Sequence, residues 1–225
     1  MEQLHNGFTL EAGGDGFPLS TDSMVLAHFA RLPRQARVLD FGSGCGTLGL
    51  LLCADDPGCS VTGLEIDPAA HAVAQQNIER NGLSGRMESI CADLRSFTGS
   101  GFPVCISNPP YFSGGFSSQT LATARQEGCC TPEDLFRCGS HLLKFGGDFF
   151  LVHKPERLAE LIATAARYKL EAKRLCLVRH RADAPVNLIL LQLRKGAKPG
   201  LQWEEMILHH ADGSPTDLYK EIYHI

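Results

Sequence analysis

The tetrapeptide Asn108-Pro109-Pro110-Tyr111 places two hydrogen-bond acceptors and an aromatic face directly after an apolar run at residues 104–107. Asn108 offers a side-chain carbonyl, and Pro109 leaves its backbone carbonyl free while its ring fixes the chain direction. Tyr111 adds a flat ring on which a planar group can stack. Together these groups suit an NH₂ group on a planar system, such as the edge of a nucleobase. A strand followed by a proline-rich turn fits the same residues equally well, because Asn-Pro dipeptides commonly begin turns.

A second pattern with chemical meaning lies where the first buried strand, residues 36–41, is expected to end. Asp40 is followed by Gly42, Gly44 and Gly46, and ligands of open α/β sheets bind beyond the carboxyl ends of the strands. Residues 44–49 match the dinucleotide fingerprint G-x-G-x-x-G, but the match begins three residues after the strand. The negative charge of Asp40 would also oppose a pyrophosphate. The pattern therefore favours S-adenosylmethionine, which carries an ammonium and a sulfonium, over NAD.

Two further acids follow the next two predicted strands. Glu65 stands about 20 residues after the glycine turn, where a carboxylate can accept both ribose hydroxyls of either cofactor. Asp93 is placed to meet the adenine ring. Each acid alone also fits a helix cap or a surface carboxylate. Three acids at three successive strand ends, beside a glycine turn, predict one cofactor site that contains Asp40, Gly42, Gly44, Gly46, Glu65 and Asp93.

The elements that must position these residues alternate between strand and helix. Buried strands are predicted at 36–41, 60–66, 86–91, 104–107 and 148–153, and helices at 47–54, 68–81, 131–144 and 156–168. Strands at 175–180 and 186–193 follow with only a short connection, so we expect them to pair antiparallel. The sequence predicts an α/β fold with a mostly parallel sheet, an antiparallel edge hairpin, and helices on both faces.

Composition limits the class of protein. The chain is 44% hydrophobic and 20% charged, which is enough for a sizeable core. No apolar run has the length of a membrane span, and residues 1–6 lack the pattern of a signal peptide. The nine cysteines include no C-x-x-C pair, which indicates reduced thiols in a cytoplasmic protein. A zinc site is a weak alternative, because adjacent cysteines are poor tetrahedral ligands; its members would be Cys129, Cys130, Cys138 and His141.

Positive charge is concentrated in residues 167–198. This stretch has nine basic and two acidic side chains, although the net charge of the chain is −4. Phosphate contacts need a local basic surface of this kind, and Arg179 and Arg181 in the predicted hairpin are the candidates. Taken alone, the cluster slightly favours the simpler interpretation of solvated helix ends and strand rims.

The combined motifs resemble the class I S-adenosylmethionine-dependent methyltransferases over most of the chain. Residues 108–111 are similar to the motif of enzymes that methylate exocyclic amino or amide nitrogens. The leader at 16–27, the segment at 123–127 and the C-terminal residues 216–223 resemble a narrower family, the bacterial tRNA1(Val) adenine-37 N6-methyltransferases. Gln126 departs from the pattern of that family. The resemblance implies one Rossmann-like domain over residues 1–225, with a leader to residue 35, a core over 36–198 and a tail over 199–225.

The resemblance also implies roles for individual residues. Asn108 and the Pro109 carbonyl would accept the two N–H bonds of adenine N6 in a tRNA anticodon loop, and Tyr111 would stack on the extruded base. Asn108 would also border the cofactor, which leaves as S-adenosylhomocysteine. Thr21 would cover the cofactor, while residues 20–22 cap a predicted helix at 23–31. The substrate contacts would be Pro110, Arg125, Arg179 and Arg181. We expect a tRNA partner, no membrane, no metal and a monomer.

Other functions share parts of the pattern. A protein glutamine N5-methyltransferase would use residues 108–111 on a glutamine amide, but such enzymes usually carry an N-terminal helical domain, and 35 residues precede the first predicted strand. A non-catalytic subunit of the same fold would be expected to have a damaged glycine turn or a damaged Asn-Pro-Pro-Tyr segment, and both are intact. Other RNA or DNA amino-methyltransferases and small-molecule methyltransferases are further alternatives.

Overall fold

The computed structural model describes residues 1–12, 19–110 and 130–225. The main sheet contains β3 (Arg37–Phe41), β4 (Ser60–Glu65), β5 (Met87–Cys91), β6 (Phe102–Ser107), β7 (Leu143–His153), β8 (Leu170–Arg181), β9 (Val186–Lys195) and β10 (Gln202–His209). The helices are α1 (Thr21–Phe29), α2 (Thr47–Asp55), α3 (Pro68–Arg80), α5 (Pro132–Leu142), α6 (Leu158–Arg167) and α7 (Asp217–Tyr223). Short elements are η1 (His5–Gly7), η3 (Pro155–Arg157) and a small ribbon of β1 (Glu2–Gln3) with β2 (Thr9–Leu10).

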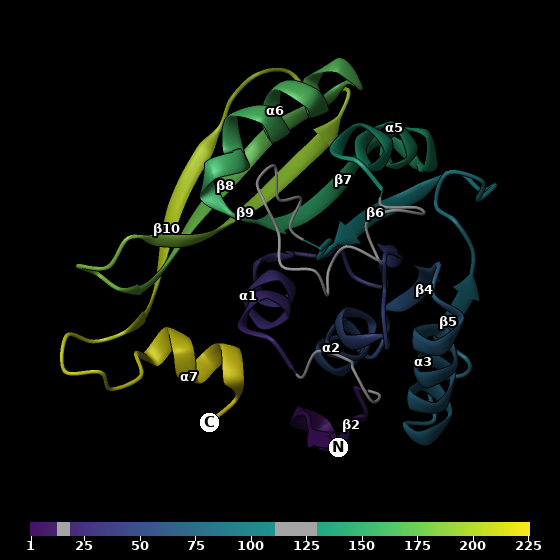
Figure 1. Ribbon diagram of the computed structural model, residues 1–225, viewed down its shortest axis with the longest axis horizontal. Coiled ribbons are helices and arrows are strands. Elements are labelled where there is room, and N and C mark those ends of the chain that lie inside the picture. Colours follow the sequence, from purple (N-terminus) through teal and green to yellow (C-terminus); the bar gives the residue numbers. More distant parts are fainter. Residues whose placement is uncertain (13–18, 111–129) are drawn as a thin grey trace, which may run out of the picture.

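The main sheet has eight strands in the order β10-β8-β9-β7-β6-β3-β4-β5, and helices cover both of its faces (Figure 1). The five strands from β5 to β7 are parallel to their neighbours. Their carboxyl ends therefore meet at one edge, which we call the carboxyl edge. Phe41 is level with Leu64 and Ser107 in the strand register, and Glu65 is level with Cys91. The predicted fold class is confirmed, and the candidate residues after these strands share this edge.

The hairpin predicted from the sequence is present, and the sheet continues beyond it. β8 and β9 pair antiparallel, and β9 also pairs antiparallel with β7. The turn between β8 and β9 therefore lies at the carboxyl edge. Residues 199–225, to which the sequence analysis gave no element, form β10 and α7, and β10 pairs parallel with β8 at the sheet margin. Met206 and Leu208, buried on β10, alternate with more exposed residues. This alternation in the sequence could have indicated a strand here.

Two hydrophobic clusters hold the helices on the sheet. Neighbouring residues of one strand belong to different clusters, as Val38 and Leu39 do, because successive side chains of a strand point to opposite faces. The first cluster contains side chains of α1, α2 and α7, and the second contains those of α5 and α6. Within the described ranges, no helix combines the length and apolarity that a membrane crossing needs.

Helix α1 begins where the sequence placed a cap, two residues earlier than predicted. The Ser20 hydroxyl accepts a hydrogen bond from the Ser23 backbone N–H at 3.2 Å, and Asp22 lies in the first turn. A capping hydroxyl and an acid at a helix N-terminus each stabilise the first turn. The cap fixes the start of α1 beside the end of β6, where Asn108 meets Ser23.

Candidate active site

The turn after β3 has a backbone that glycine adopts most readily. Gly42, Gly44 and Gly46 have φ values of 68°, 55° and 88°, in the left-handed region. The N–H groups of Gly42 and Ser43 both donate to the Leu64 carbonyl, at 2.9 and 3.0 Å. A Cβ atom at Gly46 would also lie 2.8 Å from the Met87 side chain. The turn is thus tied to β4 and leads directly into α2.

Two buried carboxylates lie beside this turn, and their surroundings differ. Glu65 is held by two backbone N–H groups, those of Gly44 at 2.7 Å and Asp67 at 2.8 Å. Asp40 is 1% exposed, and neither of its oxygens has a hydrogen-bond partner among the described residues. Burial, and to a lesser extent the charge of Glu65, raise the pKa of Asp40 to about 8. A buried carboxylate without a partner is costly, so the site suits a cationic or proton-donating ligand.

Asn77 of α3 ties the turn to the N-terminal segment. This fully buried amide donates to the carbonyls of Cys45 and Glu11, both at 2.9 Å, and accepts from the Glu11 N–H at 3.0 Å. The sequence analysis did not identify Asn77. Its spacing from Ala74 and Ile78 places it on the buried stripe of the helix. A polar residue on such a stripe could have indicated a buried hydrogen-bonding role.

Asn108 follows β6 and points its amide nitrogen at α1. Nδ2 donates to the Ser23 hydroxyl at 3.1 Å, and the Ser20 hydroxyl donates to the same Ser23 oxygen at 3.2 Å. With its nitrogen bound in this way, the Asn108 carboxamide keeps its oxygen as an acceptor. Pro109 is buried and Pro110 is exposed. The predicted residues Tyr111 and Arg125 lie outside the described residues.

Thr21 is held by the C-terminal helix. The Tyr223 hydroxyl of α7 donates to the Thr21 hydroxyl at 3.1 Å, and the Tyr223 and Tyr219 rings stack 4.2 Å apart. Next to Thr21, burial raises the pKa of Asp22, and the charge of Lys154 opposes this effect. The sequence analysis did not identify Tyr223 as a contact of Thr21, because the two residues are close only through folding.

Asp93 lies after β5, as the sequence predicted, and its carboxylate is engaged by a neighbour. Arg95 donates to both Asp93 oxygens, through Nε at 2.9 and 3.0 Å and through a terminal nitrogen at 2.6 Å. These hydrogen bonds are the main reason why the pKa of Asp93 is lowered. Arg95 was not anticipated. It holds Asp93 ionised at this end of the carboxyl edge.

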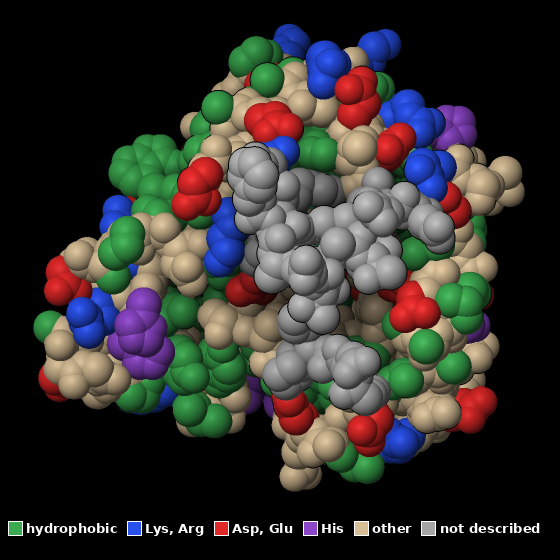
Figure 2. All heavy atoms as spheres, viewed as in Figure 1, with side chains coloured by type: hydrophobic (Ala, Val, Ile, Leu, Met, Phe, Trp, Pro, Cys, Tyr) green, Lys and Arg blue, Asp and Glu red, His purple; other side chains and the backbone are tan. Residues whose placement is uncertain are grey.

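Basic side chains of residues 167–198 form ion pairs, most of them with acids from elsewhere in the chain. Arg179 pairs with Glu205 of β10 at 3.4 Å, and Arg181 pairs with Asp183 at 3.2 Å. Similar pairs are Arg167–Glu133, Arg174–Glu204 and Arg194–Asp148. Around α6, in the upper part of Figure 2, Lys and Arg side chains are mixed with Asp and Glu. The charge excess of the stretch is therefore reduced in space, mainly by acids of α5, β7 and β10.

The fold, with a glycine turn after β3, is the fold of the class I methyltransferases. A predicted O-methyltransferase from Agrobacterium tumefaciens has a crystal structure that matches with a TM-score of 0.75 and 22% identity, covering 90% of this chain and 95% of that one. The T. thermophilus 16S rRNA N2 methyltransferase RsmC, solved with AdoMet and guanosine, matches with a TM-score of 0.57 and 22% identity, over 79% of this chain and 44% of RsmC. At these identities the matches show the fold alone.

Sequence comparisons define the family. The family model described as methyltransferase small domain matches residues 20–167. The tRNA1(Val) (adenine(37)-N6)-methyltransferase of Photobacterium profundum is 31% identical, covering 92% of this chain and 89% of the relative. The Vibrio cholerae protein of the same name is 32% identical, over 83% and 79%. The chain therefore belongs to the methyltransferase small domain family, and within it to the family of these tRNA1(Val) (adenine(37)-N6)-methyltransferases.

The Asp40 carboxylate predicts an unusual dependence of stability on pH. Because the pKa of Asp40 is about 8 in the folded protein, the folded state keeps a proton that the unfolded chain releases above about pH 4. Between about pH 4 and pH 8 the unfolded state therefore binds fewer protons than the folded state. Ionisation of Asp40 thus lowers the free energy of unfolding as pH rises through this range. We expect Asp40→Asn to gain up to about 1.4 kcal/mol of relative stability per pH unit between about pH 4 and pH 8, measured by urea denaturation without cofactor.

Asp183→Asn is the matched control, because the Asp183 side chain is 71% exposed. Its stability relative to the unchanged protein should be the same at both ends of the pH range. The same flat behaviour in Asp40→Asn would contradict the interpretation of Asp40 as a buried carboxylate that lacks a partner.

Proposed function

We propose that this protein transfers a methyl group from S-adenosylmethionine to the exocyclic N6 of an adenine in tRNA. The observation that carries the proposal is the position of two groups on the neighbouring strand ends of β3 and β6. They are the Asp40 carboxylate, which has no hydrogen-bond partner among the described residues, and the Asn108 carboxamide, whose nitrogen is already bound by Ser23. The names of the curated relatives supply the tRNA adenine as the substrate.

The residues around the glycine turn fit S-adenosylmethionine. The buried Asp40 carboxyl keeps its proton up to about pH 8 in the folded protein. The ammonium and sulfonium of this cofactor would favour its ionised form. Glu65 already accepts one N–H on each oxygen, and a carboxylate oxygen can accept more than one hydrogen bond, so it would also bind the ribose hydroxyls. Asp93, fixed by Arg95, would lie toward the adenine ring. When bound, the cofactor supplies the electrophilic methyl group.

Asn108 and Pro109 would orient the acceptor nitrogen. The lone pair of an adenine amino group is delocalised into the ring, so the group is a poor nucleophile. The Asn108 side-chain oxygen and the Pro109 backbone carbonyl would accept its two N–H bonds and direct the lone pair toward the methyl group. The same acceptors stabilise the positive charge that develops on nitrogen. Ser23 acts through Asn108 as a positioning residue, because its hydroxyl fixes which end of the carboxamide faces the substrate.

The turn between β8 and β9 would contact the RNA backbone. It lies at the same edge of the sheet as Asn108, and Arg181 there keeps 42% of its side chain exposed. Arg179 is more enclosed, at 26% exposed, and is bound to Glu205. We therefore assign phosphate contact mainly to Arg181 and a supporting role to Arg179. An anticodon-loop base is already partly unstacked, so extruding it toward Asn108 costs little.

A labelled methyl-transfer assay tests the function. The protein is incubated with methyl-labelled S-adenosylmethionine and, in parallel reactions, with unmodified bulk tRNA or with cell protein. Digestion of the tRNA to nucleosides should give label in N6-methyladenosine. Label in protein glutamine alone would instead identify a glutamine N5-methyltransferase, because a glutamine amide is also a planar NH₂ group.

The Asn108 side chain should matter for transfer and not for cofactor affinity. Asn108→Ala removes one of two acceptors of the amino group, and we expect the rate at saturating substrates to fall at least ~100-fold. Calorimetry should give an unchanged dissociation constant for S-adenosylmethionine. Gln75→Ala, which removes an exposed amide on α3, is the control and should retain full activity. Loss of cofactor binding in Asn108→Ala would contradict the assigned role.

RNA affinity should depend on which arginine of the hairpin is removed. Arg181 and Arg194 are 42% and 43% exposed, each pairs with an aspartate, and they lie toward opposite ends of the hairpin. We expect Arg181→Ala to weaken tRNA binding and to reduce the slope of log K against log salt by about one, whereas Arg194→Ala should change neither. Fluorescence anisotropy over a salt series measures both quantities. Equal affinity and equal salt dependence of the two variants would contradict the assignment of the β8–β9 turn as an RNA contact.

A further inference from the structure

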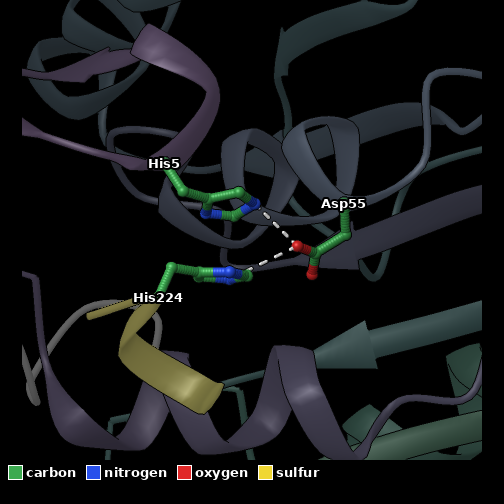
Figure 3. A group of neighbouring side chains, drawn as sticks. All are labelled: His5, Asp55 and His224. Atoms are coloured by element: carbon green, nitrogen blue, oxygen red, sulfur yellow. Dashed lines mark ion pairs between the residues drawn. The ribbon is translucent and has the colours of Figure 1, made fainter. Parts of the chain in front are cut away.

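Three side chains from distant parts of the chain meet on the side of the molecule where both chain ends lie. His5 belongs to η1, Asp55 is the last residue of α2, and His224 directly follows α7. Figure 3 shows the two imidazoles approaching the Asp55 carboxylate from different elements. Helix α2 begins after the glycine turn and ends at Asp55, so this cluster and the glycine turn lie at opposite ends of the helix.

The ligand atoms of this cluster converge. One nitrogen of each histidine and one Asp55 oxygen all lie within 4.8 Å of one another. His5 Nε2 is 2.7 Å from Asp55 Oδ1, and His224 Nε2 is 3.7 Å from the same oxygen. The two rings stack with centroids 3.6 Å apart. His5 Nε2 is buried and, within the described ranges, makes no hydrogen bond of good geometry.

We propose that His5, Asp55 and His224 form a binding site for a divalent transition-metal ion of the zinc type. Two imidazole nitrogens and one carboxylate oxygen are a donor set that zinc accepts, whereas calcium and magnesium prefer oxygen ligands alone. The three side chains line a cavity of about 190 Å³, which His28 and Glu221 also line. A fourth position therefore remains for water or for one of these neighbours. The sequence analysis expected no metal and did not identify this cluster, whose three residues are far apart along the chain.

The competing explanation is a structural His–Asp ion pair with a second histidine stacked on it. An ion pair would account for the contact of His5 with Asp55. His224 Nε2, at 3.7 Å from the same oxygen, is too far away for a hydrogen bond, so hydrogen bonding to Asp55 does not account for the approach of the second imidazole. If both stacked rings were protonated they would repel each other, whereas two neutral imidazoles around a cation would not.

The site has a defined structural consequence. An ion there would join η1, α2 and the residue after α7, and metal binding stabilises a fold when its ligands come from separate segments. Tyr223, next to His224, holds Thr21 at the start of α1. The ion would thus fasten α7 to η1 and to the end of α2, without any ligand at the carboxyl edge. Failure of this proposal would leave the proposed methyl transfer untouched, because none of the three residues belongs to that site.

Cobalt(II) titration of the full, reduced and chelator-treated chain tests the proposal. We expect one equivalent to bind, with visible absorption bands typical of nitrogen and oxygen ligands, and zinc to displace it. Asp55→Asn and His224→Ala should each weaken binding at least ~10-fold. His224 is 41% exposed, so His224→Ala should fold even if Asp55→Asn does not. The control is His141→Ala, which alters an exposed histidine near Cys138.

Several outcomes would overturn the metal site. These are the absence of saturable binding, equal cobalt affinity in the unchanged protein and His224→Ala, or a strong thiolate-to-metal charge-transfer band. The last result would mean that cysteines bind the ion instead. As a second measurement, zinc should raise the thermal unfolding midpoint of the unchanged protein and of His141→Ala, and should leave that of His224→Ala unchanged. A zinc-induced shift of the same size in His224→Ala would also overturn the proposal.

Discussion

The carboxyl edge depends on one constraint, the burial of the Asp40 carboxylate at the end of β3. This strand lies between β4 and β6, so the side chain is 1% exposed and has Glu65 as its charged neighbour. The nearby N–H of Gly44 is used by Glu65. The fold therefore places a costly group beside the glycine turn, where a Cβ atom at Gly42 or Gly44 would meet no other atom within 4 Å. Part of the stability of the cofactor-free protein is lost to this group, and a cationic ligand would recover it.

The orientation of Asn108 depends on contacts between segments that are distant in the sequence. Asn108 is oriented by Ser23, and the first turn of α1 is in turn fixed by the Ser20 cap and by Tyr223. A loosened α7 would therefore disturb the orientation of an amide on the other side of α1. Through this chain of hydrogen bonds, the C-terminal segment would influence the geometry of the proposed reaction, although we assign it no group that takes part.

The sequence predicted what depends on local pattern. The strand ends, the glycine turn, the placement of Asp40 and Glu65 at strand ends, and the Ser20 cap follow from apolar runs and from residues with special backbone preferences. It did not predict Asn77, Tyr223 or the pairing of β10 with β8, because each of these depends on which remote segments become neighbours. The cluster of His5, Asp55 and His224 was missed for the same reason.

The basic stretch shows how counting charge along the sequence can mislead. Its excess of cations is large by count, but Glu133, Asp148, Glu204 and Glu205 approach it from other elements. The opposite charges of an ion pair near the surface largely cancel, so together they exert little attraction on a phosphate some distance away. With a net charge of −4, the molecule has no strong overall attraction for RNA. Specificity for a tRNA would then depend on exposed cations such as Arg181 at the carboxyl edge and on the fit of one extruded base to Asn108, rather than on a broad positive surface.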